Sequence, residues 1–364
     1  MNYDSVNPDV YFNNSAKIAK KFTPDTYVLY RYFARKSGLF FGTDFIKKLS
    51  QSNPWGEEPT IDALPEGTYF SPNQVIMQVT GKFEDIVNLE TDFLSILTIS
   101  STALNMQSIV REANERPVYD FSARHYPKGI WGEVACAAKL GGASGCSTNL
   151  GAYWASLYPY GNEEFAKNGV GTTPHALSAV MPENKEIKWR LFPEVKNAVY
   201  FAQLFPNKPA VVLNDYSGKE LDVTKEACEV LKDYPNFWGV RLDTCGERVG
   251  QGGTESLLAG DWVKWLTGKG VTVPLCKNVR EVMDACGCKD KKIMVSSGFD
   301  AKKTEFFVKH NAPFDAIGTG SFVEFNQVTA DITHIKIGDR WEQRVKAGRE
   351  WLAKAPSFGL ERIL

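Results

Sequence analysis

The chain has 364 residues, of which 43% are hydrophobic and 23% are charged, so it is long enough to bury a large core in more than one domain. Its 42 Lys and Arg residues nearly balance 43 Asp and Glu residues, and the net charge of −1 excludes a diffuse positive field that would hold nucleic acid or an anionic membrane. An anionic ligand therefore requires a local cluster of cations. The first ten residues are polar and acidic, no continuous apolar run reaches the roughly 18 residues of a membrane span, and we expect a cytoplasmic protein.

The seven cysteines are scattered through a chain that is too large to need disulfide bonds for its stability. We therefore expect reduced thiols. Cys286 and Cys288 form the only close pair, and one such pair without a second pair or a histidine at ligand spacing is weak evidence for zinc.

The N-terminal part mixes helical and strand-like patterns. Residues 75–79 alternate as a strand does, whereas residues 85–113 contain neither proline nor glycine and carry apolar residues at three-, four- and seven-residue steps. These patterns predict a smaller mixed α/β sandwich domain over residues 1–114 that includes one or two long helices. We expect the C-terminal residues 336–364 to pack with this domain.

Beyond Pro117, short apolar segments alternate with helical ones. The apolar segments are 118–121, 210–213, 238–242, 293–295 and 314–317. Charged, hydroxylated or glycine residues follow nearly every one, as at the edge of an α/β barrel that carries the chemistry. This predicts an irregular, TIM-like α/β barrel over residues 115–335. A doubly wound open sheet also places ligands at this edge, but no Gly-x-Gly-x-x-Gly opens a helix after the first strand.

Two consecutive strand ends offer backbone donors for phosphate. Gly318-Thr319-Gly320-Ser321 follows a late strand, and Ser296-Ser297-Gly298 ends the strand before it. Glycine lets the backbone approach an anion closely, and late barrel strands commonly hold phosphate in this way. The alternative for a single Gly-x-Gly is a tight strand-to-helix turn.

Carboxylates and a cation recur at the same strand ends. Arg241 and Asp243 flank Leu242, an alternation that places both polar side chains at the barrel mouth, and Asp215 follows another strand. Such groups suit transfer of a phosphoribosyl group, in which carboxylates steady the ribose and a magnesium ion while cations hold the phosphates. Each residue taken singly could instead form a structural salt bridge or a helix cap.

His175 lies in a glycine- and threonine-containing turn before a helical segment. A histidine there more often caps or packs, but a ring nitrogen can accept a phosphoryl group.

These segments occur in the order found in the nicotinate phosphoribosyltransferase family, which includes nicotinamide phosphoribosyltransferase as a relative, and the resemblance covers most of the chain. Residues 22–27 resemble the family's N-terminal Asp-x-Tyr segment, which implies that Tyr27 stacks on a pyridine ring bound by the neighbouring subunit of a homodimer. Residues 120–125 are similar to Asp/Glu-Phe-Gly-x-Arg-Arg, so the resemblance makes Phe121 a ring-stacking residue and Arg124 a substrate contact. His125 replaces the second arginine.

Further segments carry the rest of the resemblance. Residues 141–149 resemble a Gly-Thr-Ser-Asn loop, where Ser147 and Thr148 replace the aspartate of amide-using relatives and favour nicotinate. Residues 171–175 are similar to Gly-Thr-x-x-His, which implies that ATP transiently phosphorylates His175. The segments 214–216, 241–247 and 318–321 look like Asp-Thr-Tyr, Arg-Leu-Asp-Ser-Gly-Asp and Gly-Val-Gly-Thr.

The resemblance implies an ATP-coupled nicotinate phosphoribosyltransferase that makes nicotinate mononucleotide and pyrophosphate in NAD biosynthesis. Mg²⁺ is implied near Asp215 and Asp243, which would be catalytic with His175. The implied donor-binding residues are Arg241, Ser297, Gly298, Gly318, Thr319, Gly320 and Ser321. The substrates would be nicotinate, phosphoribosyl pyrophosphate and ATP, at a site on the interface of a homodimer. The alternatives are a nicotinamide or quinolinate enzyme, a non-catalytic barrel that binds a phosphorylated metabolite, and a barrel aldolase or isomerase, which would need a lysine or an acid/base pair at a strand end.

Overall fold

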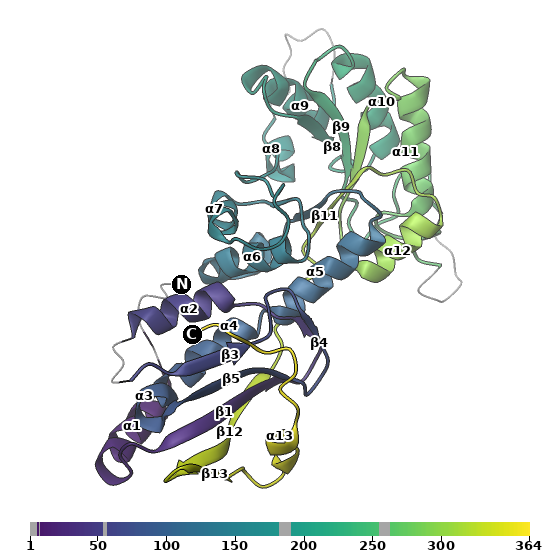
Figure 1. Cartoon of the computed structure of the whole chain (residues 1–364). Coiled ribbons are helices and arrows are strands. Elements are labelled where there is room, and N and C mark those ends of the chain that lie inside the picture. Colours follow the sequence, from purple (N-terminus) through teal and green to yellow (C-terminus); the bar gives the residue numbers. More distant parts are fainter. Residues whose placement is uncertain (1–5, 7, 54–56, 182–190, 255–262) are drawn as a thin grey trace.

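A six-stranded antiparallel sheet joins the two ends of the chain. The computed structural model describes residues 6, 8–53, 57–181, 191–254 and 263–364. The strands run in the order β13 (Arg340–Gln343), β12 (Val328–Ile337), β1 (Tyr27–Ala34), β5 (Val75–Lys82), β3 (Thr60–Ala63) and β14 (Glu361–Arg362). The expected boundary at residue 335 falls inside β12, because this strand begins at Val328 and pairs with β1. The last segments of the chain therefore complete the sheet that the first ones begin (Figure 1).

One face of β1 is buried and the other is half-buried. Val28, Tyr30 and Tyr32 are buried, whereas Tyr27, Leu29 and Arg31 alternate with them and remain partly exposed. This alternation is the period of two expected for a strand with one face on the core. The helices that accompany the sheet are α1 (Val10–Phe22), α2 (Thr43–Ser52), α3 (Phe83–Ile86), η1 (Val87–Leu89), α4 (Glu90–Leu97) and α13 (Glu350–Lys354), and a two-stranded sheet forms from β2 (Gly38–Leu39) and β4 (Tyr69–Phe70).

The helical stretch from Phe83 to Glu112 ends in α5 (Ser100–Glu112), which reaches both parts of the molecule. Helix α5 contacts β2 on one side and α12 (Ala301–Lys309) on the other (Figure 1). By length and composition alone this stretch could cross a membrane, but 56% of its most apolar window is buried inside the molecule. We read it as a core element, because Phe93, Leu97 and Met106 are fully enclosed.

The second sheet has six parallel strands. Their order is β7 (Gly145–Cys146), β6 (Val118–Asp120), β11 (Ala316–Thr319), β10 (Lys292–Val295), β9 (Phe237–Leu242) and β8 (Ala210–Leu213). The predicted α/β barrel is confirmed, and it takes the form of a curled half-barrel. It is open on one side, because within the described residues β7 and β8 are edge strands that do not pair with each other. The helices around it are α6 (Trp131–Leu140), α7 (Asn149–Leu157), α8 (His175–Ala179), α9 (Pro193–Leu204), α10 (Glu220–Leu231), α11 (Val273–Ala285) and α12, with the short turns η2 (Ala123–His125) and η3 (Lys128–Ile130).

The end of β11 is not a tight strand-to-helix turn, which was the alternative interpretation of this Gly-x-Gly segment. Gly318 and Thr319 belong to the strand itself, and the chain then leads through Phe322 and Asn326 to β12 rather than into a helix. Phe322 is buried, and the backbone N–H of Asn326 donates to the Thr98 carbonyl, so this connection is held against the helices of the antiparallel sheet. The phosphate site expected here therefore has no helix N-terminus behind it.

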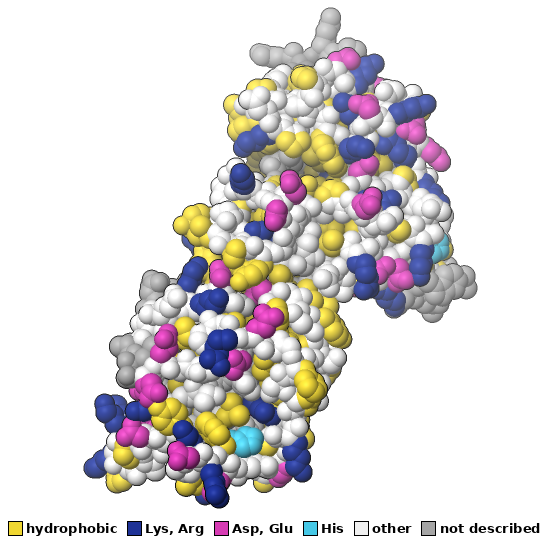
Figure 2. All heavy atoms as spheres, in the orientation of Figure 1, with side chains coloured by type: hydrophobic (Ala, Val, Ile, Leu, Met, Phe, Trp, Pro, Cys, Tyr) yellow, Lys and Arg dark blue, Asp and Glu magenta, His cyan; other side chains and the backbone are white. Residues whose placement is uncertain are grey.

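Charged side chains of both signs are interspersed over the face of the molecule in Figure 2. This agrees with the near-zero net charge and directs attention to local clusters.

Candidate active site

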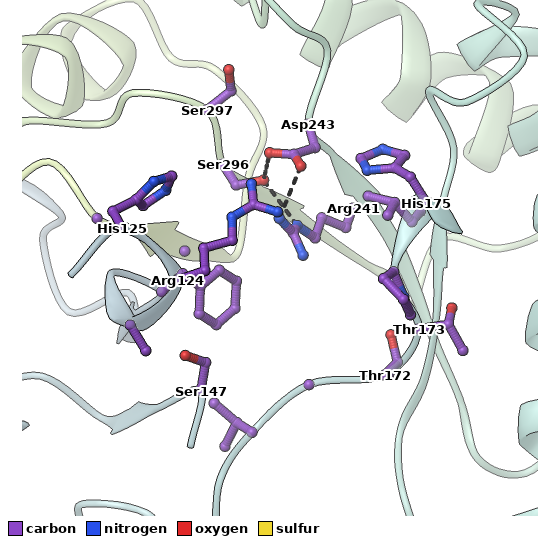
Figure 3. Close-up of a pocket in the computed structure, with 18 of the residues that line it drawn as sticks. Arg124, His125, Ser147, Thr172, Thr173, His175, Arg241, Asp243, Ser296 and Ser297 are labelled. Atoms are coloured by element: carbon purple, nitrogen blue, oxygen red, sulfur yellow. Dashed lines mark hydrogen bonds and ion pairs between the residues drawn. The ribbon is translucent and has the colours of Figure 1, made fainter. Parts of the chain in front are cut away.

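A cavity of about 1160 Å³ opens at the carboxyl ends of the parallel strands. It is lined by residues from the ends of β6, β7, β8, β9, β10 and β11 and by the segment before α8, which includes residues 169–176. Figure 3 shows these side chains converging from separate loops. The carboxyl edge of a parallel sheet is where such folds place ligands, so this cavity is the candidate site.

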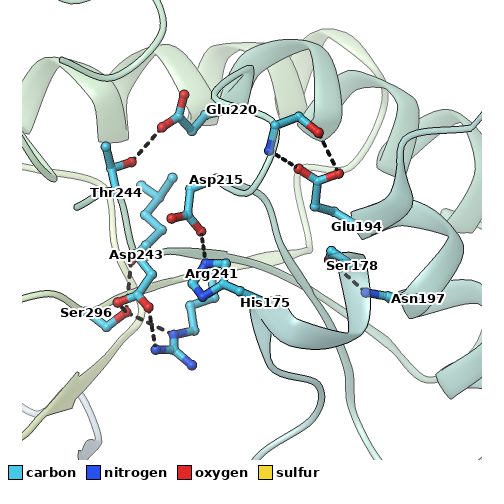
Figure 4. Close-up of polar contacts among 12 residues, drawn as sticks. His175, Ser178, Glu194, Asn197, Asp215, Glu220, Arg241, Asp243, Thr244 and Ser296 are labelled. Carbon is cyan, nitrogen blue, oxygen red and sulfur yellow. Dashed lines mark hydrogen bonds and ion pairs between the residues drawn. The ribbon is translucent and has the colours of Figure 1, made fainter. Parts of the chain in front are cut away.

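Arg241, Asp243 and Ser296 form one hydrogen-bonded group. The Arg241 guanidinium donates from Nη2 to Asp243 Oδ2 at 3.0 Å and from Nε to Ser296 Oγ at 2.9 Å. Ser296 Oγ in turn lies 2.7 Å from Asp243 Oδ1, and the guanidinium lies 5.0 Å from the centroid of the Phe121 ring. Leu242 is buried between the two charged residues, as the strand alternation predicts. The group fixes one cation and one carboxylate at the mouth (Figure 4).

His175 pairs with Asp215 across the same mouth. His175 begins α8 and its Nε2 lies 2.8 Å from Asp215 Oδ1; the imidazole is 36% exposed, whereas the carboxylate is 8% exposed. The hydrogen bond to Asp215 raises the pKa of His175 above its ordinary value of 6.5, against the lowering effect of burial. In the neutral ring, donation from Nε2 leaves the lone pair on Nδ1. The arrangement therefore suits a histidine that acts as a nucleophile.

A buried hydrogen-bond network holds the loops that carry the Asp215 and Asp243 carboxylates. Glu220, at the start of α10, accepts from Thr244 Oγ1 at 2.6 Å, from the backbone N–H of Gln251 at 3.1 Å and from Arg248. Arg248 also donates to the carbonyl of Asp215 at 3.0 Å. Burial alone would raise the pKa of Glu220, but the hydrogen bonds outweigh it and hold the pKa below its usual value. Glu220 thus ties the segment after β9 to the segment after β8.

Phe121 and Arg124 also line the cavity. A Cβ on Gly318 would come within 2.2 Å of the Phe121 ring, so glycine at that position lets the ring lie against β11. In the described part of the chain no acceptor is bonded to the Arg124 guanidinium, in contrast to Arg241. The side chain is therefore available to an anionic group.

Ser147 and Thr148 both line the cavity, but the Thr148 hydroxyl already has a partner. Its Oγ1 accepts from the backbone N–H of Gly151 at 3.1 Å and caps α7, while the Ser147 N–H donates to the Asp120 carbonyl at 2.9 Å. Ser147 therefore has the freer hydroxyl of the two.

The structure brings most of the predicted donor-binding residues together. Lining the cavity are Arg241, Ser297, Gly298, Gly318, Gly320 and Ser321. Ser297 and Gly298 both adopt the left-handed region, with φ of +72° and +71°. A Cβ on Gly320 would lie 3.4 Å from His125 Cδ2, so this glycine places the end of β11 directly beside His125.

Two predicted residues lie elsewhere. Thr319 does not line the cavity, because its side chain turns inward and its hydroxyl donates to the Phe299 carbonyl at 2.6 Å. Tyr27 lies on the half-buried face of β1 in the antiparallel sheet, where its hydroxyl bonds to Glu57 and Lys336 Nζ lies 5.8 Å from its ring. Within one chain, Tyr27 is therefore outside the site.

Comparison with known proteins finds similarity to quinolinate and nicotinate phosphoribosyltransferases. Residues 9–101 match the family model of the quinolinate phosphoribosyl transferase N-terminal domain. A nicotinate phosphoribosyltransferase from Mycobacterium tuberculosis is 25% identical over 77% of this chain, and the match covers 51% of that protein. The crystal structure of nicotinate-nucleotide pyrophosphorylase from Pyrococcus furiosus superposes with a TM-score of 0.73 at 26% identity, over 94% of this chain and 77% of that one. The chain is similar to members of the nicotinate phosphoribosyltransferase family.

Two further findings qualify this similarity. The chain spans about half the length of the curated relatives that it matches. Human nicotinic acid phosphoribosyltransferase shares the fold with a TM-score of 0.66, at 16% identity over 92% of this chain and 75% of that one. At that identity the likeness speaks for the fold alone.

Against this family background, the site contains residues that the sequence reasoning did not select. Trp131 and Cys245 line the cavity, and His125, noted only as a departure from the family pattern, does as well. Ser296, named from the sequence with the strand end before Ser297, also lines the cavity. The Cys286 and Cys288 pair lies away from the cavity, and within the described residues no group of three or more His, Cys, Asp or Glu side chains could hold a metal ion.

Proposed function

We propose that this protein is a nicotinate phosphoribosyltransferase, which joins nicotinate to 5-phosphoribosyl-1-pyrophosphate and releases pyrophosphate. The observation that carries the proposal is that one cavity offers two kinds of surface. Phe121 gives a ring face and Arg124 a cation with no acceptor among the described residues, and beside them stand Arg241, Asp243 and the Ser297–Gly298 loop. A flat monocarboxylate and a phosphorylated sugar need these two kinds of surface.

In this proposal the protein residues bind and orient, and no protein nucleophile bonds to the sugar. The pyridine nitrogen attacks the anomeric carbon while the bond to pyrophosphate breaks, and positive charge develops on the ribose. Asp243 and Asp215 would stabilise that charge, and Arg241 would hold phosphate oxygens through the donors that Asp243 and Ser296 leave free. The rigid pairing of Arg241 keeps these groups in place before the donor binds.

Magnesium fits the donor set as a metal that arrives with the substrate. Asp215 and Asp243 provide carboxylates at the mouth, and Mg²⁺ is usually held by one or two carboxylates together with phosphates and waters. When bound, the ion would neutralise charge on the leaving pyrophosphate.

ATP coupling belongs to the proposal through His175. Its Nε2 is engaged by Asp215, and it lies at the start of α8 in a segment whose Thr172 and Thr173 line the same cavity, so Nδ1 could accept the γ-phosphoryl group of ATP. We propose that this phosphorylation is coupled to transfer and is not itself a step in forming the glycosidic bond.

Quinolinate is the second candidate base, because the family model that matches residues 9–101 is that of quinolinate phosphoribosyl transferase. That match lies outside the cavity. Quinolinate carries two carboxylates, and the arginines that line the cavity are Arg124 and the already paired Arg241. We therefore favour the monocarboxylate.

A homodimer completes the proposed site. Tyr27 is displayed on the half-buried face of the antiparallel sheet, outside its own cavity. A second copy could present that face to the cavity mouth, so that its Tyr27 stacks on the base.

The reaction is tested by measuring nucleotide and pyrophosphate together after incubation with nicotinate, phosphoribosyl pyrophosphate and Mg²⁺. We expect the two products in equal amounts, and Asp243→Asn should reduce the rate by about two orders of magnitude, because it removes charge stabilisation at the sugar. Pyrophosphate released without nucleotide would mean that the protein hydrolyses the donor and does not transfer the sugar.

A further inference from the structure

A buried lysine lies directly behind the loop that ends β10. Lys303 is in the first turn of α12 and is 7% exposed. Its Nζ donates to the Ser297 carbonyl at 2.9 Å and lies 4.3 Å from the centroid of the Phe299 ring. Ser297 and Gly298 line the cavity, whereas Lys303 does not. The amine therefore reaches the site only through the loop.

The loop is shaped to present backbone donors. Ser297 and Gly298 both adopt the left-handed backbone conformation, which is unfavourable for a serine and so needs support from its surroundings. The Ser297 carbonyl is held by Lys303 and the Phe299 carbonyl by the Thr319 hydroxyl. In the described part of the chain, the N–H groups of Ser297, Gly298 and Phe299 have no acceptor. Successive free N–H groups in such a turn form a concave anion site.

The charge of Lys303 is poorly compensated. The charged and titratable groups that face it are Asp300, Asp243, Lys264 and the Cys276 thiol, and among the described residues no carboxylate is within ion-pair distance of its nitrogen. Burial lowers the pKa of Lys303 to about 8. A methionine would fill similar space without this penalty, so an anion on the far side of the loop would account for a lysine here.

We propose that Lys303 is a positioning residue for a phosphate group of the substrate: it holds the Ser297–Gly298 loop in its anion-binding shape and places a buried positive charge behind it. The identity of that phosphate, as part of the phosphoribosyl donor, rests on the proposed function. The binding of phosphate by the loop does not.

Phosphate binding should then take up a proton. A bound anion favours the charged form of Lys303 and raises its pKa, so near pH 8 the protein binds more protons with phosphate than without it. Affinity should fall as the pH rises through this range, because the free protein increasingly holds Lys303 neutral.

The test is calorimetric titration with inorganic phosphate at about pH 8 in two buffers of different ionisation enthalpy, which reports affinity and proton uptake together. Lys303→Met should bind phosphate about tenfold more weakly and lose the extra uptake. Lys309→Met is the matched control, because Lys309 lies on the same helix with a side chain 69% exposed, and it should behave as wild type. Equal affinity and equal uptake in Lys303→Met would overturn the proposal, as would a wild-type protein that does not bind phosphate.

A second measurement keeps the test decisive if Lys303→Met does not fold. The wild-type dissociation constant for phosphate should rise between about pH 7.5 and 9, and a constant value would overturn the proposal. Cys245 also lines the cavity, so Cys245→Ser must retain the same pH dependence.

The two proposals can fail separately. Lys303-dependent phosphate binding without nucleotide formation from any pyridine base would remove the proposed function and leave the role of Lys303. Nucleotide formation, together with a phosphate affinity that Lys303→Met leaves unchanged, would support the proposed function and remove the role of Lys303.

Discussion

His175 and Asp215 are the residues whose chemistry is most open to direct measurement. The hydrogen bond between them fixes one ring nitrogen and raises the pKa of the imidazole. Loss of His175 should therefore affect ATP coupling and leave the binding surfaces for base and sugar intact. We predict that His175→Ala abolishes stimulation by ATP but retains slow, ATP-independent transfer, measured as nucleotide formed with and without ATP. Unchanged stimulation would exclude His175 as the phosphorylated residue.

The raised pKa sets the pH dependence of this coupling. Phosphoryl transfer to the ring needs the neutral imidazole, so ATP stimulation should increase as the pH rises through a value above 6.5. Asp215→Asn removes the main cause of the raised pKa and should move the midpoint of the profile to lower pH, whatever it does to the maximal rate. The ratio of rates with and without ATP, followed across pH, measures the midpoint. A midpoint that Asp215→Asn leaves in place would show that another group titrates.

Strands β6 and β11 position the Phe121 ring, which we propose binds the base, through the absence of a Cβ at Gly318. Because a Cβ at Gly318 would come within 2.2 Å of the ring of Phe121, Gly318→Ala must displace the ring or the strand, at a cost of about 1–3 kcal/mol. We predict a KM for nicotinate raised about tenfold, with a smaller change in the KM for the donor, from steady-state kinetics. Gly129→Ala is the control, since its Cβ would meet nothing within 4 Å and Gly129 does not line the cavity. Equal effects on both KM values would place Phe121 outside the base site.

Helix α10 stabilises the mouth through Glu220. Because the folded-state pKa of Glu220 is lowered, its contribution to stability is present above its ordinary pKa of 4.5 and is lost as the pH falls through the folded value. Glu220→Gln weakens the pairing with Arg248 and should cost about 3–5 kcal/mol of unfolding free energy at neutral pH, measured by denaturant titration. The variant should also lose less stability than wild type on acidification. An unchanged acid profile would assign that dependence to other carboxylates.

The sequence predicted those elements whose signals are local. Buried parallel strands such as β8 and β9 are short apolar runs followed by polar residues, and both lie where the pattern places them. The edge strand β7 has only two residues and carries no such pattern. Whether β7 and β8 pair to close a barrel depends on contacts far apart in the sequence, so the open side of the sheet was not predicted. The inward direction of the Thr319 side chain and the pairing of Glu220 with Arg248 depend on contacts between residues far apart in the sequence. A local sequence pattern does not predict such contacts.

At the scale of the whole molecule, the proposal requires two copies for one complete site. If Tyr27 serves the cavity of the partner, a dimer of one Tyr27→Ala chain and one Arg241→Ala chain contains one intact cavity. We predict that mixing the two impaired variants under conditions that exchange subunits restores activity that neither homodimer shows. Light scattering should give the mass of a dimer for each preparation. A monomeric protein, or mixed dimers no more active than the parents, would contradict the shared site.

The central claim is that this cavity transfers a phosphoribosyl group to a pyridine monocarboxylate, and one measurement tests it most directly. The protein is incubated with phosphoribosyl pyrophosphate, Mg²⁺ and an equimolar mixture of nicotinate, nicotinamide and quinolinate, with and without ATP, and the nucleotides are identified by mass spectrometry. The account predicts nicotinate mononucleotide as the main product, in larger amount with ATP. Nicotinamide mononucleotide as the main product, or no nucleotide from any of the three bases, would contradict it.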